Sequence, residues 1–295
     1  MISDLKKNGK RSKPDWLKVK INLNNNYRKV SELVAQNDLN TVCVEARCPN
    51  IYECWEAKTA TIMILGDICT RSCGFCSVKT GRPPKIDNDE PYRVARAVKK
   101  MDLDHIVITS VDRDDIRNDY GAEIWAQTIE AIRKNVPKCG IEVLTPDFKA
   151  HEPSVLKVLK AKPNIFSHNV ETVKRISRMV RPNSDWDRTE KVLKLSVENG
   201  LVTKTGLMVG LGETDKEVLD TMKIFADIGV SIFNIGQYLQ PTKKHLTVDR
   251  FVHPDLFAFY KEEGIKYGFK VVESGPLVRS SYHAASQSNK FNGLA

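Results

Sequence analysis

The chain has 295 residues, of which 41% are hydrophobic and 28% are charged. This composition is typical of a globular protein that can bury a sizeable core in one large domain or two modest ones. The mean hydropathy of −0.36 and the absence of an apolar run near the roughly 18 residues that cross a bilayer exclude a membrane-spanning segment, and no apolar stretch follows the basic start as in a secretory signal. We therefore expect a soluble, cytoplasmic protein without a membrane partner.

The positive charge is concentrated at the N-terminus. The chain holds 46 Lys and Arg residues against 37 Asp and Glu residues, a net charge of +9, and residues 1–30 contribute +7 of it. This basic arm is either a solvated, partly disordered segment or a means of steering an acidic partner. Nucleic acid is not an expected partner, because the arm has few aromatic residues for stacking (Trp16 and Tyr27) and no nucleic-acid-binding motif.

From Thr59 onward, short apolar runs alternate with amphipathic stretches. The apolar runs are rich in Val and Ile and show little strict alternation, which is typical of parallel strands buried on both faces. Predicted strands cover residues 60–69, 104–111, 140–146, 164–171, 201–212 and 230–241. Predicted helices cover residues 91–101, 123–136, 153–162, 185–200, 215–229 and 254–267, with Gly229 as a C-terminal cap.

Six βα units in succession predict an α/β protein with a partial (β/α)6 parallel barrel, whose chemistry gathers at the carboxyl ends of the strands. The barrel is expected over residues 59–269. An N-terminal extension of residues 1–58 and a C-terminal tail of residues 270–295 are expected to pack on it, since the extension is too short for a core of its own.

Six of the seven cysteines lie in two triplets that precede and follow the first predicted strand. The odd number and the absence of an export signal argue against disulfides, so the triplets indicate metal or cluster ligation in a reducing compartment. Cys139 stands apart and is expected to be a buried or incidental thiol. The triplets are C-x4-C-x5-C (Cys43, Cys48, Cys54) and C-x3-C-x2-C (Cys69, Cys73, Cys76).

Thiolates bind both zinc and iron–sulfur clusters. Structural zinc needs four closed ligands, whereas a triplet that holds a four-iron cluster leaves one iron open for chemistry. The alternative is a zinc-stabilised nucleic-acid-binding protein that uses the basic arm. That protein would be colourless, whereas two four-iron clusters would give a brown protein with about eight irons.

The second triplet, with Phe75 before its last cysteine and its position after the first strand, resembles the radical S-adenosylmethionine superfamily. The first triplet and the RSSYHA segment at residues 279–284 narrow the resemblance to the lipoyl synthase family, and it extends over nearly the whole chain from about residue 40. Other sulfur-inserting or methylthiolating radical enzymes share the second triplet but lack this combination.

The resemblance implies that Cys69, Cys73 and Cys76 hold a 4Fe-4S cluster whose open iron is chelated by S-adenosylmethionine. Reduction of this cluster would release a 5′-deoxyadenosyl radical. The resemblance further implies that the first triplet and Ser281 hold an auxiliary 4Fe-4S cluster, which donates the sulfur. The implied reaction inserts two sulfur atoms at C6 and C8 of a protein-bound octanoyl chain. Without the resemblance, the RSSYHA segment would be taken for a polar tail that ligates nothing.

Other site residues follow less directly. Asn169 and Glu171 can hydrogen-bond the polar groups of S-adenosylmethionine, Arg181 can pair with its carboxylate, and residues 206–213 can bring backbone close to its adenine. Each can equally be a structural polar residue at the rim of a barrel. Residues 112–115 form a charge cluster that is expected to be paired within itself.

The resemblance also implies partners. The octanoyl chain is carried on a lysine of a small carrier domain, as in dehydrogenase E2 subunits and the glycine cleavage H protein, and an electron donor reduces the clusters. Carrier domains of this kind are commonly acidic around that lysine. Deleting residues 1–20 is therefore expected to weaken carrier binding in a salt-dependent way.

Overall fold

We analysed the fold in a computed structural model, which describes residues 13–18, 25–36, 39–45, 48, 50–289 and 291. Most of the basic arm, residues 1–12 and 19–24, lies outside the described residues. None of the helices in the described ranges is both long and apolar enough to cross a membrane.

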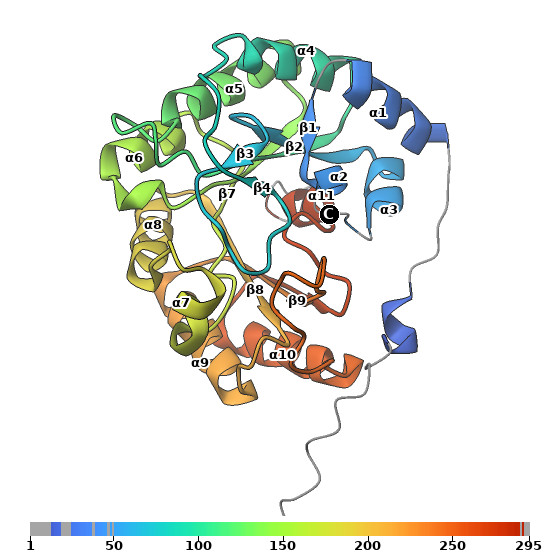
Figure 1. The fold of residues 1–295 in the computed structure, drawn as a ribbon, viewed down its shortest axis with the longest axis vertical. Helices are drawn as coiled ribbons and strands as arrows, with labels where there is room; N and C mark the ends of the chain where they lie inside the picture. The colour runs from blue at the N-terminus through green and yellow to red at the C-terminus, as the bar shows by residue number, and fades with distance from the viewer. Residues whose placement is uncertain are drawn as a thin grey trace, which may run out of the picture.

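The centre of the fold is an eight-stranded sheet that curves into a partial barrel (Figure 1). Every neighbouring pair of strands is parallel except β1 and β2, which are antiparallel. The expected partial parallel barrel is therefore confirmed. In spatial order the strands are β1 (Asn40–Thr41), β2 (Thr59–Ile64), β5 (His105–Ser110), β6 (Gly140–Leu144), β7 (Ile165–Ser167), β8 (Val202–Val209), β9 (Ile232–Gln237) and β10 (Val271–Gly275).

Six long helices cover the outside of the sheet (Figure 1). Each begins and ends within two residues of the range that the hydrophobic periodicity predicts. Gly229 ends α9 in the left-handed conformation, with φ 98°, as its expected capping role requires. The helices are α4 (Glu90–Met101), α5 (Ala122–Asn135), α6 (Glu152–Lys160), α8 (Trp186–Glu198), α9 (Asp215–Ile228) and α10 (Pro254–Tyr267).

Several predicted strands end earlier than expected. The run 60–69 stops at Ile64, because Leu65 and Gly66 adopt positive φ values of 66° and 88°. Residues Ile68–Cys69 instead form β3, which pairs with β4 (Lys79–Thr80) in a separate two-stranded sheet. The run 201–212 ends in the same way before Gly210, with φ 98°.

Strand β7 is also much shorter than the predicted run 164–171. After Ser167 the chain keeps only an isolated parallel bridge between Glu171 and Leu207. The last predicted run, 230–241, narrows to Ile232–Gln237. In each case the apolar pattern continues past the point where the chain leaves the sheet, since the loop residues that follow are buried or half-buried.

Both terminal extensions contribute strands to the main sheet. In the N-terminal extension, β1 pairs with β2, and three helices follow the same side of the barrel: α1 (Asn25–Gln36), α2 (Val42–Glu45) and α3 (Ile51–Glu56). The expected tail begins with β10, a seventh parallel strand, and ends in α11 (Ala284–Asn289), which contacts β5 and β6. The short elements β1, α2, α3, β10 and α11 were not predicted because they have too few residues to show a period. Helix α1, with 12 residues, is long enough to show one and was overlooked.

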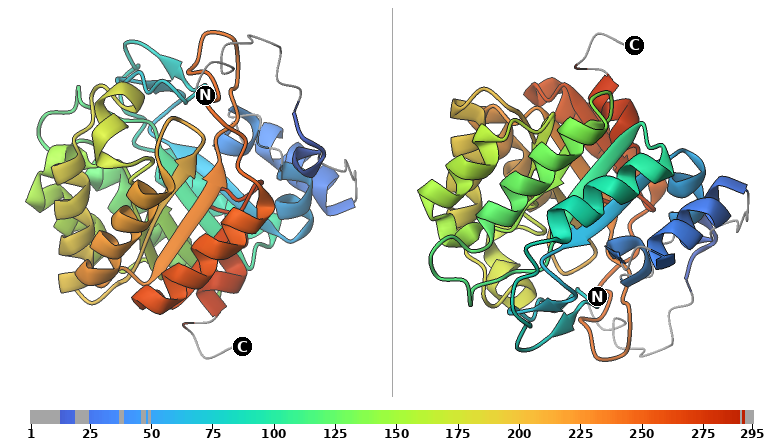
Figure 2. Two further views of the ribbon diagram at one scale, coloured as in Figure 1. Left: turned by 90° about the horizontal axis from the view of Figure 1, so that it is seen from below. Right: turned by 90° about the horizontal axis from the view of Figure 1, so that it is seen from above.

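Two apolar clusters fill the layer between sheet and helices, one beneath α4–α6 and the other beneath α8–α10. The side of the sheet that faces the central cavity is more polar, and it includes Thr61, Thr109 and Asn234. Side chains along a strand point alternately to the two faces of the sheet. Each strand can therefore place apolar side chains against the helices and polar side chains in the central cavity. Figure 2 shows the helical layer outside the strands from two further directions.

Candidate functional site

A cavity of about 560 Å³ opens at the carboxyl ends of the parallel strands. This volume lies within the range of small-molecule sites. The cavity brings together residues of both cysteine triplets, of the C-terminal segment and of the loops after β5 and β7. The expected site residues that line it are Cys43, Cys48, Cys69, Cys73, Cys76, Asn169, Glu171, Arg181 and Ser281; Cys54 is described but does not line the cavity.

The loop of the second triplet is held by two neighbouring segments. The backbone N–H of Gly74 donates to the carbonyl of Val180, 2.9 Å away, and its carbonyl accepts from Leu246 at 3.0 Å. A Cβ atom at Gly74 would lie 2.8 Å from Leu246 Cγ, so only glycine fits without movement. His245 Nε2 lies 2.9 Å from the carbonyl oxygen of Cys76. The segment after β9 therefore packs against the loop that carries the second triplet.

The thiols of this triplet are partly buried and unpaired, and all seven cysteines of the chain are free. Burial raises the pKa of Cys73 to about 12 and that of Cys76 to about 11, and it also raises the pKa of Cys69. Metal binding to thiols of this kind requires the release of their protons.

The first triplet comes from three neighbouring pieces of the N-terminal extension. Cys43 lies in α2 and Cys54 in α3, and the N–H of Cys48 donates to the carbonyl of Cys43 at 3.0 Å. Burial and, to a smaller extent, the neighbouring Cys48 raise the pKa of Cys43 to about 11. Burial, together with Cys43 and Cys48, raises the pKa of Cys54. The three thiols thus lie within electrostatic range of one another.

The RSSYHA segment runs alongside the first triplet. Thr61 Oγ1 donates to Ser281 Oγ at 2.9 Å, and the hydroxyl of Tyr282 donates to the Glu53 carboxylate at 3.1 Å, next to Cys54. Two residues before the RSSYHA segment begins, the carbonyl of Leu277 accepts from Asn50 Nδ2 at 2.6 Å. Ser281 is therefore brought to the side of the cavity where Cys43 and Cys48 lie, more than 220 residues away in the sequence.

The donor set suits clusters rather than a single metal ion. Among the described residues, no three His, Cys, Asp or Glu side chains lie close enough together to ligate one ion. Cys69, Cys73 and Cys76 all line the cavity, and three thiolates can hold a four-iron cluster with one iron left open. The buried indole N–H of Trp55, next in sequence to Cys54, interacts with the Cys43 thiol and helps to lower its pKa, against the larger effect of burial. Such an N–H can donate to a cluster sulfur.

The three residues expected to contact S-adenosylmethionine lie next to one another. Asn169 Nδ2 donates to Glu171 Oε1 at 3.1 Å and to Ser280 Oγ at 2.6 Å, and Arg181 Nη1 donates to the carbonyl of Asn169 at 3.0 Å. Burial raises the pKa of Glu171. Arg181 Nε is buried without a hydrogen-bond partner in the described residues, so it can donate to a bound carboxylate. Of residues 206–213, only Gly206, Leu207 and Met208 line the cavity.

Sequence analysis missed several residues at this site. The prediction that residues 112–115 pair within themselves holds only for Arg113 and Asp115, which are 2.9 Å apart. Asp112 and Asp114 instead pair with Arg71, inside the second triplet. Thr61 and Arg279 also line the cavity. Thr61 carries no sequence signal for such a role, because threonine is common in strands. Arg71 could have been singled out, because it lies between two predicted cluster ligands, Cys69 and Cys73.

Two family models match the chain. The model of the radical SAM superfamily matches residues 63–225, and the model of the N-terminal domain of lipoyl synthase of the radical SAM family matches residues 3–48. The first match spans the barrel strands β5–β8 and the second triplet, and the second match includes Cys43 and Cys48.

Curated relatives agree over almost the whole chain. The chain is 53% identical over 281 residues to a lipoyl synthase of Rubrobacter xylanophilus, covering 95% of this chain and 87% of the relative. It is 52% identical over 274 residues to a lipoyl synthase of Flavobacterium johnsoniae, covering 92% of this chain and 95% of the relative.

Solved structures share the fold at low sequence identity. SuiB of Streptococcus suis, in its crystal structure bound to S-adenosylmethionine, superposes with a TM-score of 0.59 and 13% identity over 77% of this chain and 54% of SuiB. HydG, a maturase of the FeFe hydrogenase, superposes with a TM-score of 0.53 and 13% identity over 88% of this chain and 70% of HydG. With the fold, both triplets and full-length relatives in agreement, the chain belongs to the lipoyl synthase family of the radical S-adenosylmethionine superfamily.

Proposed function

We propose that the cavity at the mouth of the barrel carries out the reaction of the family and that its two cysteine triplets have different tasks. Lipoyl synthases are sulfurtransferases that insert sulfur at C6 and C8 of a carrier-bound octanoyl chain, with S-adenosylmethionine and two 4Fe-4S clusters as cofactors. In this proposal Cys69, Cys73 and Cys76 hold the cluster that meets S-adenosylmethionine. The first triplet and Ser281 hold the auxiliary cluster.

When bound, these groups supply the radical and the sulfur atoms, which side chains cannot provide. The protein supplies binding and orientation. The open donor of Arg181 and the amide of Asn169 are suited to the carboxylate and the other polar groups of S-adenosylmethionine. The half-buried Glu171 lies within hydrogen-bonding distance of Asn169 and keeps that amide oriented.

The observation that carries this proposal is the lining of one cavity by both triplets. Cys43 and Cys48 line one side of it, while Cys73 and Cys76 come from the loop after β3. An alkyl chain between the two sets of thiols would be within reach of both bound cofactors. Apolar residues, including Met63, Val111 and Leu144, provide walls that suit an octanoyl chain and exclude water.

We also propose a role for each segment of the chain, the partners of the protein and its compartment. Residues 1–58 supply the auxiliary ligands, residues 59–269 the barrel, and residues 270–295 the segment with Ser281. The substrates are octanoylated lipoyl domains. We place the E2 subunits and the glycine cleavage H protein among them, with a separate electron donor, in the cytoplasm, where the thiols stay reduced.

Single cysteine substitutions separate the two tasks. After anaerobic reconstitution we expect about eight irons in the unmodified chain and about four in each of Cys69→Ala and Cys43→Ala. Cys69→Ala is expected to abolish cleavage of S-adenosylmethionine. Cys43→Ala is expected to retain cleavage to 5′-deoxyadenosine while forming no lipoyl product from an octanoyl-lysine peptide.

Cys139→Ala is the matched control, because Cys139 is a buried cysteine outside the cavity. It should retain about eight irons and both activities. The proposal fails if Cys43→Ala still inserts sulfur, or if Cys69→Ala still cleaves S-adenosylmethionine.

A further inference from the structure

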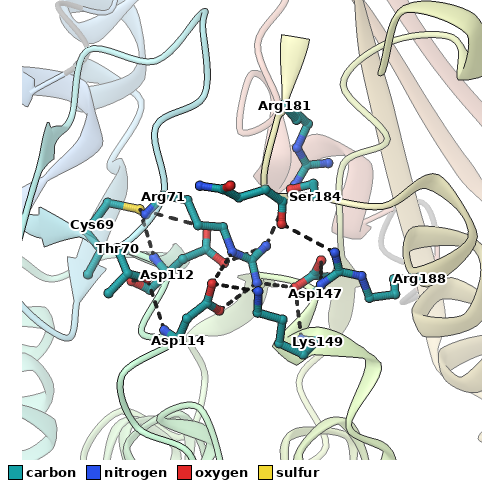
Figure 3. A network of polar contacts seen from close by, with 12 residues as sticks. Cys69, Thr70, Arg71, Asp112, Asp114, Asp147, Lys149, Arg181, Ser184 and Arg188 are labelled. Atoms are coloured by element: carbon teal, nitrogen blue, oxygen red, sulfur yellow. Dashed lines mark hydrogen bonds and ion pairs between the residues drawn. The ribbon is translucent and has the colours of Figure 1, made fainter. Parts of the chain in front are cut away.

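Arg71 lies between the first two cysteines of the second triplet, yet its side chain is only 1% exposed. Figure 3 shows Arg71 among the residues of its polar network. Its guanidinium contacts three aspartates. Nε and Nη2 each donate to the Asp114 carboxylate at 2.8 Å, Nη2 donates to Asp147 at 2.7 Å, and Nη1 lies 3.2 Å from Asp112. The two-pronged pairing with Asp114 fixes the orientation of the whole group. The loop of the second triplet is thus tied to the ends of β5 and β6.

The same contacts fix two backbone donors to the sulfur of Cys69. The N–H groups of Arg71 and Asp112 each donate to Cys69 Sγ at 3.4 Å. Thr70 connects these two backbone segments, since its N–H and its hydroxyl both donate to the carbonyl of Asp112. Any movement of Arg71 relative to Asp112 would therefore change the hydrogen bonding of this one sulfur.

The network also controls the charge beside this sulfur. Its three carboxylates, Asp112, Asp114 and Asp147, face Arg71 together with Lys149, 3.0 Å from Asp114, and Arg188, 3.4 Å from Asp147. Arg71 is paired with Asp112 at 3.2 Å, and Arg181 also favours the charged form of that carboxylate. Without Arg71, Asp112 would lose its ion pair, with its Oδ2 only 4.0 Å from Cys69 Sγ.

We propose that Arg71 is a positioning residue that raises the reduction potential of the cluster held by the second triplet. It acts by fixing two N–H donors on Cys69 and by neutralising the carboxylate beside that sulfur. Hydrogen bonds to a ligand sulfur, and the removal of nearby negative charge, both stabilise the reduced state of an iron–sulfur cluster. The inference rests on the proposed role of Cys69, Cys73 and Cys76 as cluster ligands.

The test uses the full chain with Cys43→Ala, so that the cluster of the second triplet is the only one present. Adding Arg71→Gln should leave about four irons bound but move the midpoint potential, measured by an EPR-monitored redox titration, to a more negative value. At a fixed reductant potential the ratio of reduced to oxidised cluster should fall about tenfold, which corresponds to about 59 mV for a one-electron couple. Arg71→Lys, which keeps the charge but loses the two-pronged pairing, should give an intermediate potential.

Arg113→Gln is the matched control. Arg113 is another buried arginine, paired with Asp115 two residues away, but it has no contact with Cys69, so the potential should not change. Thermal unfolding of the iron-free proteins shows whether each variant is folded.

An unchanged potential in folded Arg71→Gln and Arg71→Lys would overturn the inference, and so would a folded variant that no longer binds iron. Failure of the proposed function is a different result: Cys69→Ala in the otherwise unmodified chain would then keep all of its iron.

Discussion

At the scale of single residues, Thr61 contacts both the N-terminal extension, at Cys43, and the C-terminal segment, at Ser281. Its side chain is 4% exposed and points into the cavity from the middle of β2. Its hydroxyl donates to Ser281 Oγ and, against the larger effect of burial, helps to lower the pKa of the Cys43 thiol. One hydroxyl therefore touches a thiol and a serine that we assign to the auxiliary cluster.

Thr61→Val removes this hydroxyl and keeps the shape of the side chain. We expect the auxiliary cluster to be bound about 10- to 100-fold more weakly, the usual effect of losing a group that orients a metal ligand. The measurement is iron content during stepwise chelation, with S-adenosylmethionine cleavage as the readout of the other cluster. Thr59→Val is the matched control, because Thr59 lies in the same strand and its hydroxyl donates to the carbonyl of Ala57. Equal iron retention in both variants would contradict the role of Thr61.

At the scale of structural elements, the segment that follows β10 is held close against β9. Asn234 Nδ2 donates to the carbonyl of Ser280 at 3.0 Å, and the carbonyl of Val278 approaches Gly236 so closely that a Cβ there would lie 2.1 Å from it. A side chain at position 236 would have to displace backbone, which cannot move as a flexible side chain can. The strand therefore sets the depth at which Ser281 enters the cavity.

Gly236→Ala should push the RSSYHA segment outward and away from Cys43 and Cys48. We expect loss of sulfur insertion and of about four irons, with cleavage of S-adenosylmethionine retained. Gly275→Ala is the matched control, since its Cβ would meet the same Val278 at 3.4 Å, an ordinary contact distance. The expectation fails if Gly236→Ala forms lipoyl product at the rate of Gly275→Ala.

At the scale of the whole molecule, the described part of the basic arm reaches the active face. Lys13 lines the mouth of the cavity, and the ring of Trp16 packs against that of His253 with centroids 5.2 Å apart. Residues 13–18 thus bring the arm to the mouth of the cavity, where we propose that an octanoylated carrier binds. This position favours the steering role of the arm over that of a solvated extension.

Replacing four cations of the arm by serine should weaken binding of an acidic octanoylated carrier domain about tenfold at low salt and much less at high salt, because screening removes long-range attraction. The variant changes Lys6, Lys7, Lys10 and Arg11. Affinity is measured by titration calorimetry at two salt concentrations.

The control replaces four exposed lysines at the opposite edge of the barrel, where α4 and α5 end: Lys99, Lys100, Lys134 and Lys138. It changes the net charge equally, so an equal loss of affinity would show that only total charge matters and would remove the steering role.

The sequence by itself determined the alternation of strands and helices, the parallel barrel and both cysteine triplets. These depend on short-range patterns: apolar periods within one element, and ligands that are neighbours in the chain. Only the tertiary structure decided that Ser281 meets Thr61, that Arg71 faces Asp147 and that β10 extends the sheet. Such contacts join residues 39 to 220 positions apart, and they depend on how far the sheet curves and where each strand ends, which no local pattern contains.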